Sequence, residues 1–120
     1  MSGELIVIGI SHHTAPVELR ERLATGDADI PAELQALVTE AGLNEALLLS
    51  TCNRVELYAH AVEPHKALER ARAHFRERGG DGVDTCLYQH RGAEATHHAF
   101  RVAASLDSLV VGEPQILGQV

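Results

Sequence analysis

The sequence contains no tryptophan, and its aromatic residues together amount to only 3% of the chain. Hydrophobic residues nevertheless make up 45% of the 120 residues, enough for one domain with an interior of Leu, Val, Ile and Ala. No apolar run approaches the roughly 18 residues that a membrane-spanning helix needs, and the N-terminus lacks a basic start followed by an apolar core. We therefore expect a cytoplasmic protein that does not associate with membranes.

Lysine and cysteine are also scarce. Lys66 is the single lysine beside nine arginines, and the formal net charge is −7. This acidic balance argues against a dedicated nucleic-acid binder, which normally carries a basic face. The two cysteines, Cys52 and Cys86, provide no disulfide framework and suit a reducing compartment. We interpret Cys86 as a small buried residue of a strand.

Hydrophobic periodicity predicts four strands and four helices. The strands are expected at 5–10, 46–49, 55–60 and 83–90, and the helices at 17–23, 31–41, 64–78 and 93–106, with residues 79–82 as a turn after the third helix. Their order, β-α-α-β-β-α-β-α, puts a hairpin between two halves that each carry helices. This order is typical of the α+β class and of a ferredoxin-like sandwich, in which helices cover an antiparallel sheet.

The short connection from Ser50 to Arg54 is the strongest candidate for chemistry. Cys52 lies there between two predicted strands, with Arg54 two residues away. A thiolate is the reactive form of cysteine, and a nearby cation stabilises it. Taken alone, Cys52 is equally compatible with a structural cysteine at a strand end, and Arg54 with a solvated side chain.

Eight histidines suggest a metal site, but their spacing argues against one. Neighbouring side chains on a helix point about 100° apart, so His97 and His98 cannot easily bind one ion together. We therefore expect no metal. His98 falls at the edge of the apolar face of its predicted helix, while His97 falls on the solvent side. His98 is either a buried structural histidine or a proton-transfer group.

The remaining histidines receive no role at this stage. We place four of them on strand or helix surfaces: His60, His65, His74 and His90. Residues 11–14, which include His12 and His13, either cap the following helix or line a cleft, and capping is the simpler interpretation.

Four segments carry a family resemblance when they are taken in order. They are residues 9–21 (GISHHTAPVELRE), residues 49–58 (LSTCNRVELY), His98 with residues 101–103, and residues 106–120 (LDSLVVGEPQILGQV). Together they resemble the N-terminal catalytic domain of glutamyl-tRNA reductase. The resemblance implies a ferredoxin-like fold and an NADPH-dependent oxidoreductase that converts glutamyl-tRNA to glutamate-1-semialdehyde. This reaction is the first step of porphyrin and haem biosynthesis by the five-carbon tetrapyrrole route.

The resemblance also implies roles for particular residues. Cys52 would be the nucleophile that forms a glutamyl thioester, and His98 would act as acid, base or polariser of the carbonyl. Arg54 could bind the substrate's side-chain carboxylate through a bidentate fork, and Glu113 could bind its α-ammonium group. The residues expected to line the glutamate pocket are Thr51, Asn53, Arg54, Ser108, Glu113, Pro114, Gln115 and Gln119.

The cofactor and further domains are expected outside this sequence. No GxGxxG follows any predicted strand, so no dinucleotide site is visible. By resemblance, residues 1–106 form the catalytic domain, and residues 107–120 begin a helix that leads to NADPH-binding and dimerisation domains. We expect glutamyl-tRNA as substrate, a homodimer in the full-length protein, and glutamate-1-semialdehyde aminotransferase as a candidate partner. By itself the chain is expected to cleave the ester at most.

Two other classes of function stay open from the sequence. A ferredoxin-like regulatory module that binds a small amino acid without catalysis would account for the fold and for Arg54, but it leaves Cys52 unexplained. A metal-binding protein would account for the histidines.

Overall fold

The computed structural model describes residues 3–111, with side chains described through Leu106. The four strands are β1 (Glu4–Ser11), β2 (Glu45–Ser50), β3 (Arg54–Ala61) and β4 (Tyr88–Arg91). The α-helices are α1 (Val17–Leu23), α2 (Ile30–Ala41), α3 (Pro64–Gly79) and α4 (Ala93–Val111), and two short 3-10 turns are η1 (Asp27–Asp29) and η2 (Asp81–Val83). The strands form one sheet in the order β2-β3-β1-β4, and each neighbouring pair is antiparallel.

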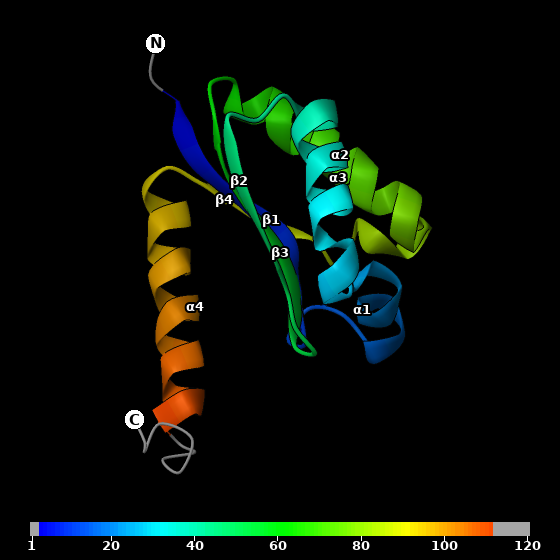
Figure 1. Ribbon diagram of the computed structural model, residues 1–120, viewed down its shortest axis with the longest axis vertical. Helices are drawn as coiled ribbons and strands as arrows, with labels where there is room; N and C mark the ends of the chain where they lie inside the picture. The colour runs from blue at the N-terminus through cyan, green and yellow to red at the C-terminus, as the bar shows by residue number, and fades with distance from the viewer. Residues whose placement is uncertain (1–2, 112–120) are drawn as a thin grey trace.

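The two faces of the sheet are covered unequally. Helices α1, α2 and α3 lie on one face, whereas α4 lies alone on the other (Figure 1). Helix α4 packs on β1 and β4 and runs back toward the end of the sheet that carries the β2–β3 connection (Figure 1). The predicted α+β sandwich, an antiparallel sheet covered by helices, is confirmed. In the part of the chain described, no helix is long and apolar enough to cross a membrane.

Strand alternation assigns each side chain to one of these faces. On β1, Ile6, Ile8 and Ile10 belong to the hydrophobic core beneath α1, α2 and α3, together with Leu57 of β3 and Phe75 of α3. Since successive strand residues point to opposite faces, the residues between them point toward the side of α4. The predicted alternation of β3 is therefore correct, and its polar residues are gathered on the α4 face.

The fourth strand is shorter than predicted, and the last helix is longer. The prediction placed a strand at 83–90, but the chain turns at its start, with the amides of Cys86 and Leu87 bonded to the carbonyl of Val83. Cys86 is therefore half-buried against the core in a turn and is not part of a strand. Helix α4 continues to Val111, so the boundary drawn after residue 106 falls inside a helix. The division into domains stays a prediction.

His74 corrects another expectation, because it is buried between α2 and α3 and does not lie on the surface. Its Nδ1 is 2.8 Å from Glu40 and its Nε2 is 2.8 Å from Glu33, which also pairs with Arg78 at 2.7 Å. Burial alone would lower the pKa of His74, but the hydrogen bonds to the two carboxylates outweigh it and raise the pKa. A charged imidazole thus joins the two helices.

Replacing His74 by Gln should destabilise the chain in a pH-dependent way. The protonated imidazole stabilises the native state below its ordinary pKa of about 6.5, and this contribution is lost as the pH rises through the raised native pKa. We expect His74→Gln to lower the free energy of unfolding by about 1–3 kcal/mol near pH 6 and by less near pH 9, as measured by urea unfolding.

The matched control is His65→Gln on the same helix, where an exposed imidazole faces Glu69 at 3.4 Å. This change should alter stability by less than about 0.5 kcal/mol at either pH. An equal loss for His74→Gln at both pH values would contradict the charged bridge.

Candidate active site

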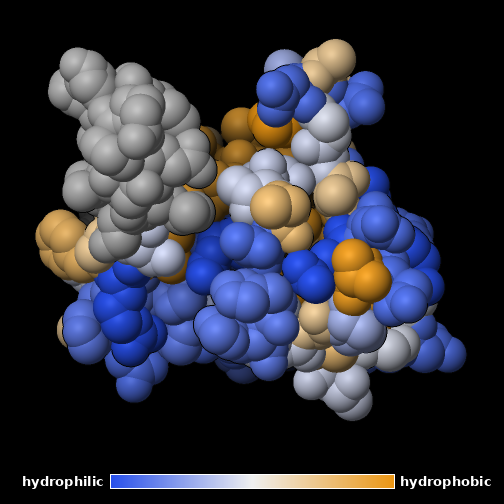
Figure 2. Space-filling view, turned by 90° about the horizontal axis from the view of Figure 1, so that it is seen from below, coloured by the Kyte–Doolittle hydropathy of each residue, from blue (hydrophilic) through white to orange (hydrophobic). Residues whose placement is uncertain are grey.

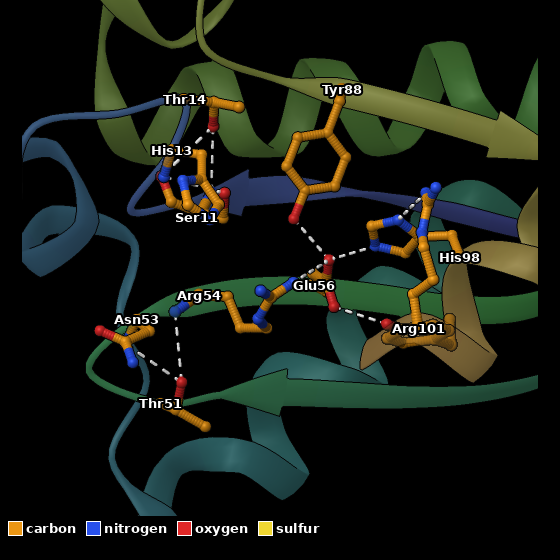
Figure 3. A network of polar contacts seen from close by, with 11 residues as sticks. Ser11, His13, Thr14, Thr51, Asn53, Arg54, Glu56, Tyr88, His98 and Arg101 are labelled. Carbon is orange, nitrogen blue, oxygen red and sulfur yellow. Dashed lines mark hydrogen bonds and ion pairs between the residues drawn. The ribbon is translucent and has the colours of Figure 1, made fainter. Parts of the chain in front are cut away.

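The connection that carries Cys52 is held in place by hydrogen bonds, and its thiol is exposed. The Thr51 hydroxyl accepts from the backbone amides of Asn53 and Arg54, at 3.1 and 3.2 Å. The Asn53 carbonyl accepts from the amide of His12, at 2.8 Å. The connection is thus closed on itself through Thr51 (Figure 3). It is also tied through His12 to the turn that follows β1.

The turn after β1 does not have the capping role that we preferred. Helix α1 begins after Pro16, without a side-chain hydrogen bond at its N-cap. The Thr14 hydroxyl instead accepts from the amide of Ser11 at 3.0 Å, so these polar side chains stabilise the turn itself. Ser11 and His13 line a cavity, which is the alternative that the sequence left open.

The most buried charge near this connection is the carboxylate of Glu56 on β3. Its exposed fraction is 0%. Four side chains donate to it: the Tyr58 hydroxyl at 2.5 Å, His98 Nε2 at 2.6 Å, Arg54 at 3.1 Å, and the Tyr88 hydroxyl. Two strands, β3 and β4, and helix α4 therefore contribute to one buried polar network (Figure 3).

Gly9 explains how a carboxylate fits between the sheet and α4. In the ladder Gly9 is paired with Glu56 on one side and with Tyr88 on the other. A Cβ at position 9 would lie 2.9 Å from Cγ of Glu56 and would collide with the Val55 carbonyl oxygen. Because glycine has no side chain, Glu56 and Tyr88 can approach each other across β1.

The network keeps Glu56 ionised. Burial favours the neutral acid, but the hydrogen bonds from Tyr58, Tyr88 and His98 outweigh it and lower the pKa of Glu56. Burial and the hydrogen bond to this carboxylate raise the pKa of both tyrosines far above the ordinary range. Both phenols therefore stay protonated and act as hydrogen-bond donors.

His98 lies buried on α4 and His97 is exposed, which confirms the prediction made from helix periodicity. A carboxylate only accepts hydrogen bonds, so His98 Nε2 must carry a proton toward Glu56. A guanidinium only donates, and the Arg101 nitrogen lies 3.5 Å from Nδ1. For a ring with one proton, the two contacts favour the tautomer with the proton on Nε2 and the lone pair of Nδ1 on the side of Arg101.

His90 was expected to be a surface histidine without a role, but it is half-buried against His98, with ring centroids 4.7 Å apart. Burial and the neighbouring His98 lower the pKa of His90. The His90 ring thus packs against His98 and favours its own neutral form.

A cavity of about 250 Å³ opens beside His98 and Arg54. It is lined by Ser11, His13, Arg54, Tyr88, His98, Arg101 and Val102. The two guanidinium groups in its lining give this cavity the chemistry that suits an anionic ligand. Cys52 is not among the lining residues, but it lies two positions before Arg54, so their Cα atoms are at most about 7 Å apart.

The end of the molecule that carries the β2–β3 connection is largely hydrophilic (Figure 2). Thr51 and Asn53 lie on this connection and hold its backbone.

Five predicted pocket residues lie where no side chain is described, so their roles stay predictions. They are Ser108, Glu113, Pro114, Gln115 and Gln119. Within the described residues, His, Cys, Asp and Glu nowhere form a group of three or more that could hold a metal.

Comparisons with known proteins agree on one family. The model described as "Glutamyl-tRNAGlu reductase, N-terminal domain" matches residues 8–120. The chain belongs to this family. The glutamyl-tRNA reductase of Solibacter usitatus is 48% identical over 120 residues, covering 98% of this chain and 28% of the relative. That of Xanthomonas axonopodis pv. citri is 51% identical over 116 residues, covering 97% of this chain and 26% of the relative.

The structural comparison gives the same family. The glutamyl-tRNA reductase from Methanopyrus kandleri has a TM-score of 0.65 and 35% sequence identity, and the match covers 99% of this chain and 26% of that one. The chain therefore spans about a quarter of the length of the glutamyl-tRNA reductases that it matches.

The structure also adds residues that sequence reasoning missed in this member of the glutamyl-tRNA reductase family. The main one is Glu56, whose carboxylate is contacted by Arg54 and His98. The others lie around this carboxylate and the cavity: Gly9, Tyr58, Tyr88 and Arg101. Gly9, Glu56, Tyr58 and Arg101 lie inside the segments that carry the family resemblance, and this was a usable signal. Tyr88 carried none, because its partner is 32 residues away.

Replacing Gly9 on β1 by Ala should disturb the hydrogen-bond network around Glu56. The new methyl group would be forced against β3 and Glu56, so we expect the free energy of unfolding to fall by about 1–3 kcal/mol in urea. Gly82→Ala is the matched control, because a Cβ there meets nothing within 4 Å, and we expect a change below about 0.5 kcal/mol. Equal stabilities of the two variants would contradict the tight fit at Gly9.

Proposed function

We propose that this chain is the part of a glutamyl-tRNA reductase that takes the glutamyl group from its tRNA ester onto Cys52. The observation that supports this most is the placement of an exposed thiol on a fixed connection, close to a cavity lined by Arg54, Arg101 and His98. Membership of the family makes glutamyl-tRNA the expected substrate.

The proposed step replaces an ester by a thioester. The Cys52 thiolate attacks the glutamyl carbonyl carbon, a C–S bond forms, and the bond to the ribose oxygen of the tRNA breaks. The ribose oxygen leaves with the electron pair of that bond and takes up a proton. An ester accepts hydride poorly because resonance damps its carbonyl, whereas a thioester is more electrophilic, so covalent catalysis divides one hard step into two.

His98 is the proposed proton carrier for this exchange. The lone pair of Nδ1, which faces Arg101 at 3.5 Å, is the basic site of the singly protonated ring, while Glu56 stabilises the imidazolium that forms when Nδ1 takes up the proton of the Cys52 thiol. The proton can then pass to the leaving ribose oxygen. Glu56 itself stays ionised, because four donors surround it.

Arg54 is proposed to bind the side-chain carboxylate of the glutamyl group. One of its nitrogens is committed to Glu56, at 3.1 Å. A guanidinium has several N–H donors, so Arg54 can hold Glu56 and still present donors to the cavity that it lines. Arg101 adds a second positive charge to the same cavity.

The hydride step lies outside the structure described here. All neighbouring strands in the described sheet are antiparallel and no GxGxxG follows any of them, so residues 3–111 lack the parallel βαβ unit of a Rossmann-type dinucleotide site. We propose NADPH, bound by a separate domain of the longer protein, as the reductant. A role in tetrapyrrole synthesis, a homodimer and an aminotransferase partner belong to the same proposal.

The alternative is an amino-acid-binding regulatory module. The cavity and its two guanidiniums fit a small acidic amino acid equally well, and the buried Glu56 network would then only support the binding site. This hypothesis gives the exposed Cys52 no function, so covalent capture of the substrate separates the two.

Mixing the protein with glutamyl-tRNA should give a glutamyl adduct on Cys52, detectable by mass spectrometry of the peptide that contains it. Cys52→Ser should abolish the adduct, because a hydroxyl beside these groups is a far weaker nucleophile. The control Cys86→Ser removes the thiol in the turn before β4 and should leave the adduct intact. Binding of glutamate without any adduct in the wild-type protein would favour the regulatory module.

A further inference from the structure

Helix α1 contributes one side chain to the connection that carries Cys52. Arg20 donates from a terminal guanidinium nitrogen to the carbonyl oxygen of Cys52, at 2.9 Å. The two residues are 32 positions apart, so this contact joins the helix to the candidate nucleophile across the fold. Thr51 and His12 hold the flanking parts of the connection, and Arg20 holds Cys52 itself.

Another part of the Arg20 side chain, its Nε, is buried in an unfavourable environment. Its Nε is the one buried side-chain nitrogen or oxygen without a hydrogen-bond partner among the described side chains. A buried donor left unpaired is unfavourable and is uncommon in native proteins. The bond to the Cys52 carbonyl therefore holds the Arg20 guanidinium where one of its donors, Nε, stays unpaired.

The position of Arg20 also brings a positive charge close to the sulfur of Cys52. The carbonyl oxygen and Sγ of a cysteine are four covalent bonds apart, so the guanidinium lies within roughly 8 Å of the Cys52 sulfur. The other ionisable groups tied to this connection are His12, through its amide, and Arg54 at the start of β3, which is paired with Glu56. Arg20 is therefore the cation bonded directly to the nucleophile residue.

We propose that Arg20 is a positioning residue for Cys52: it fixes the backbone of the nucleophile and keeps a positive charge beside the thiolate. This inference rests on the proposed function, in which Cys52 is the nucleophile. Arginine suits the task because it stays charged at every physiological pH and its fork has a fixed geometry. An activated thiolate needs such a cation nearby.

The test follows the alkylation of Cys52 by iodoacetamide across a range of pH, with Cys86 in the same molecule as an internal reference. Arg20→Gln should slow alkylation of Cys52 about three- to tenfold near neutral pH and move its profile to higher pH, because thiolate becomes harder to form. Alkylation of Cys86 should not change. Arg20→Lys keeps the charge on the same helix face and should retain more than about half of the wild-type rate.

The matched control is Arg22→Gln. Arg22 lies on the same helix and also donates to a backbone carbonyl, that of Gly79, at 3.1 Å. It should cost similar stability in urea unfolding while leaving the alkylation profile of Cys52 unchanged. An Arg20→Gln profile that coincides with that of Arg22→Gln would overturn the proposal.

This test is independent of the substrate. If Arg20→Gln slows alkylation but the wild-type protein forms no glutamyl adduct, the proposed function fails while the positioning role stands. If the adduct forms and alkylation is unaffected by Arg20→Gln, the positioning role alone is wrong.

Discussion

The carboxylate of Glu56, buried between the sheet and α4, is the group on which the candidate site depends. Burying a charge is unfavourable unless donors replace its water, and here two tyrosines, a histidine and an arginine do so. The same contacts fix the direction of each donor. Removing the carboxylate would leave His98 without orientation and Arg54 without a buried partner, so the cavity beside them would lose its shape and its charge distribution.

This interaction also links the fold to the site. Gly9 pairs with Glu56 and Tyr88, and its missing side chain makes room for them on the α4 face of the sheet. On the opposite face the aliphatic residues of the same strands form the core. Each strand therefore supports stability on one face and chemistry on the other. The connection after β2 then brings Cys52 to the end of the sheet where the cavity lies.

Much of the fold could be predicted because hydrophobic periodicity is a local signal. The bounds of α1, the start of α3, the alternation of β3 and the separation of His98 from His97 all follow from residues close in sequence. The prediction failed where distant partners decide the outcome. Glu56 and His74 look like surface residues from their neighbours alone, and each is buried because partners from other elements satisfy its charge. The strand predicted at 83–90 failed because a turn at Val83 takes up its first residues.

The tautomeric state of His98 decides its role: Glu56 holds the ring with its proton on Nε2, and the lone pair of Nδ1 faces Arg101 and the cavity. This state can be measured through the nitrogen chemical shifts of His98 in protein labelled with ¹⁵N-histidine, assigned with a His98→Asn variant. At mildly alkaline pH we predict a protonated Nε2 and a lone-pair signal for Nδ1. A proton found on Nδ1 would contradict this account of the site.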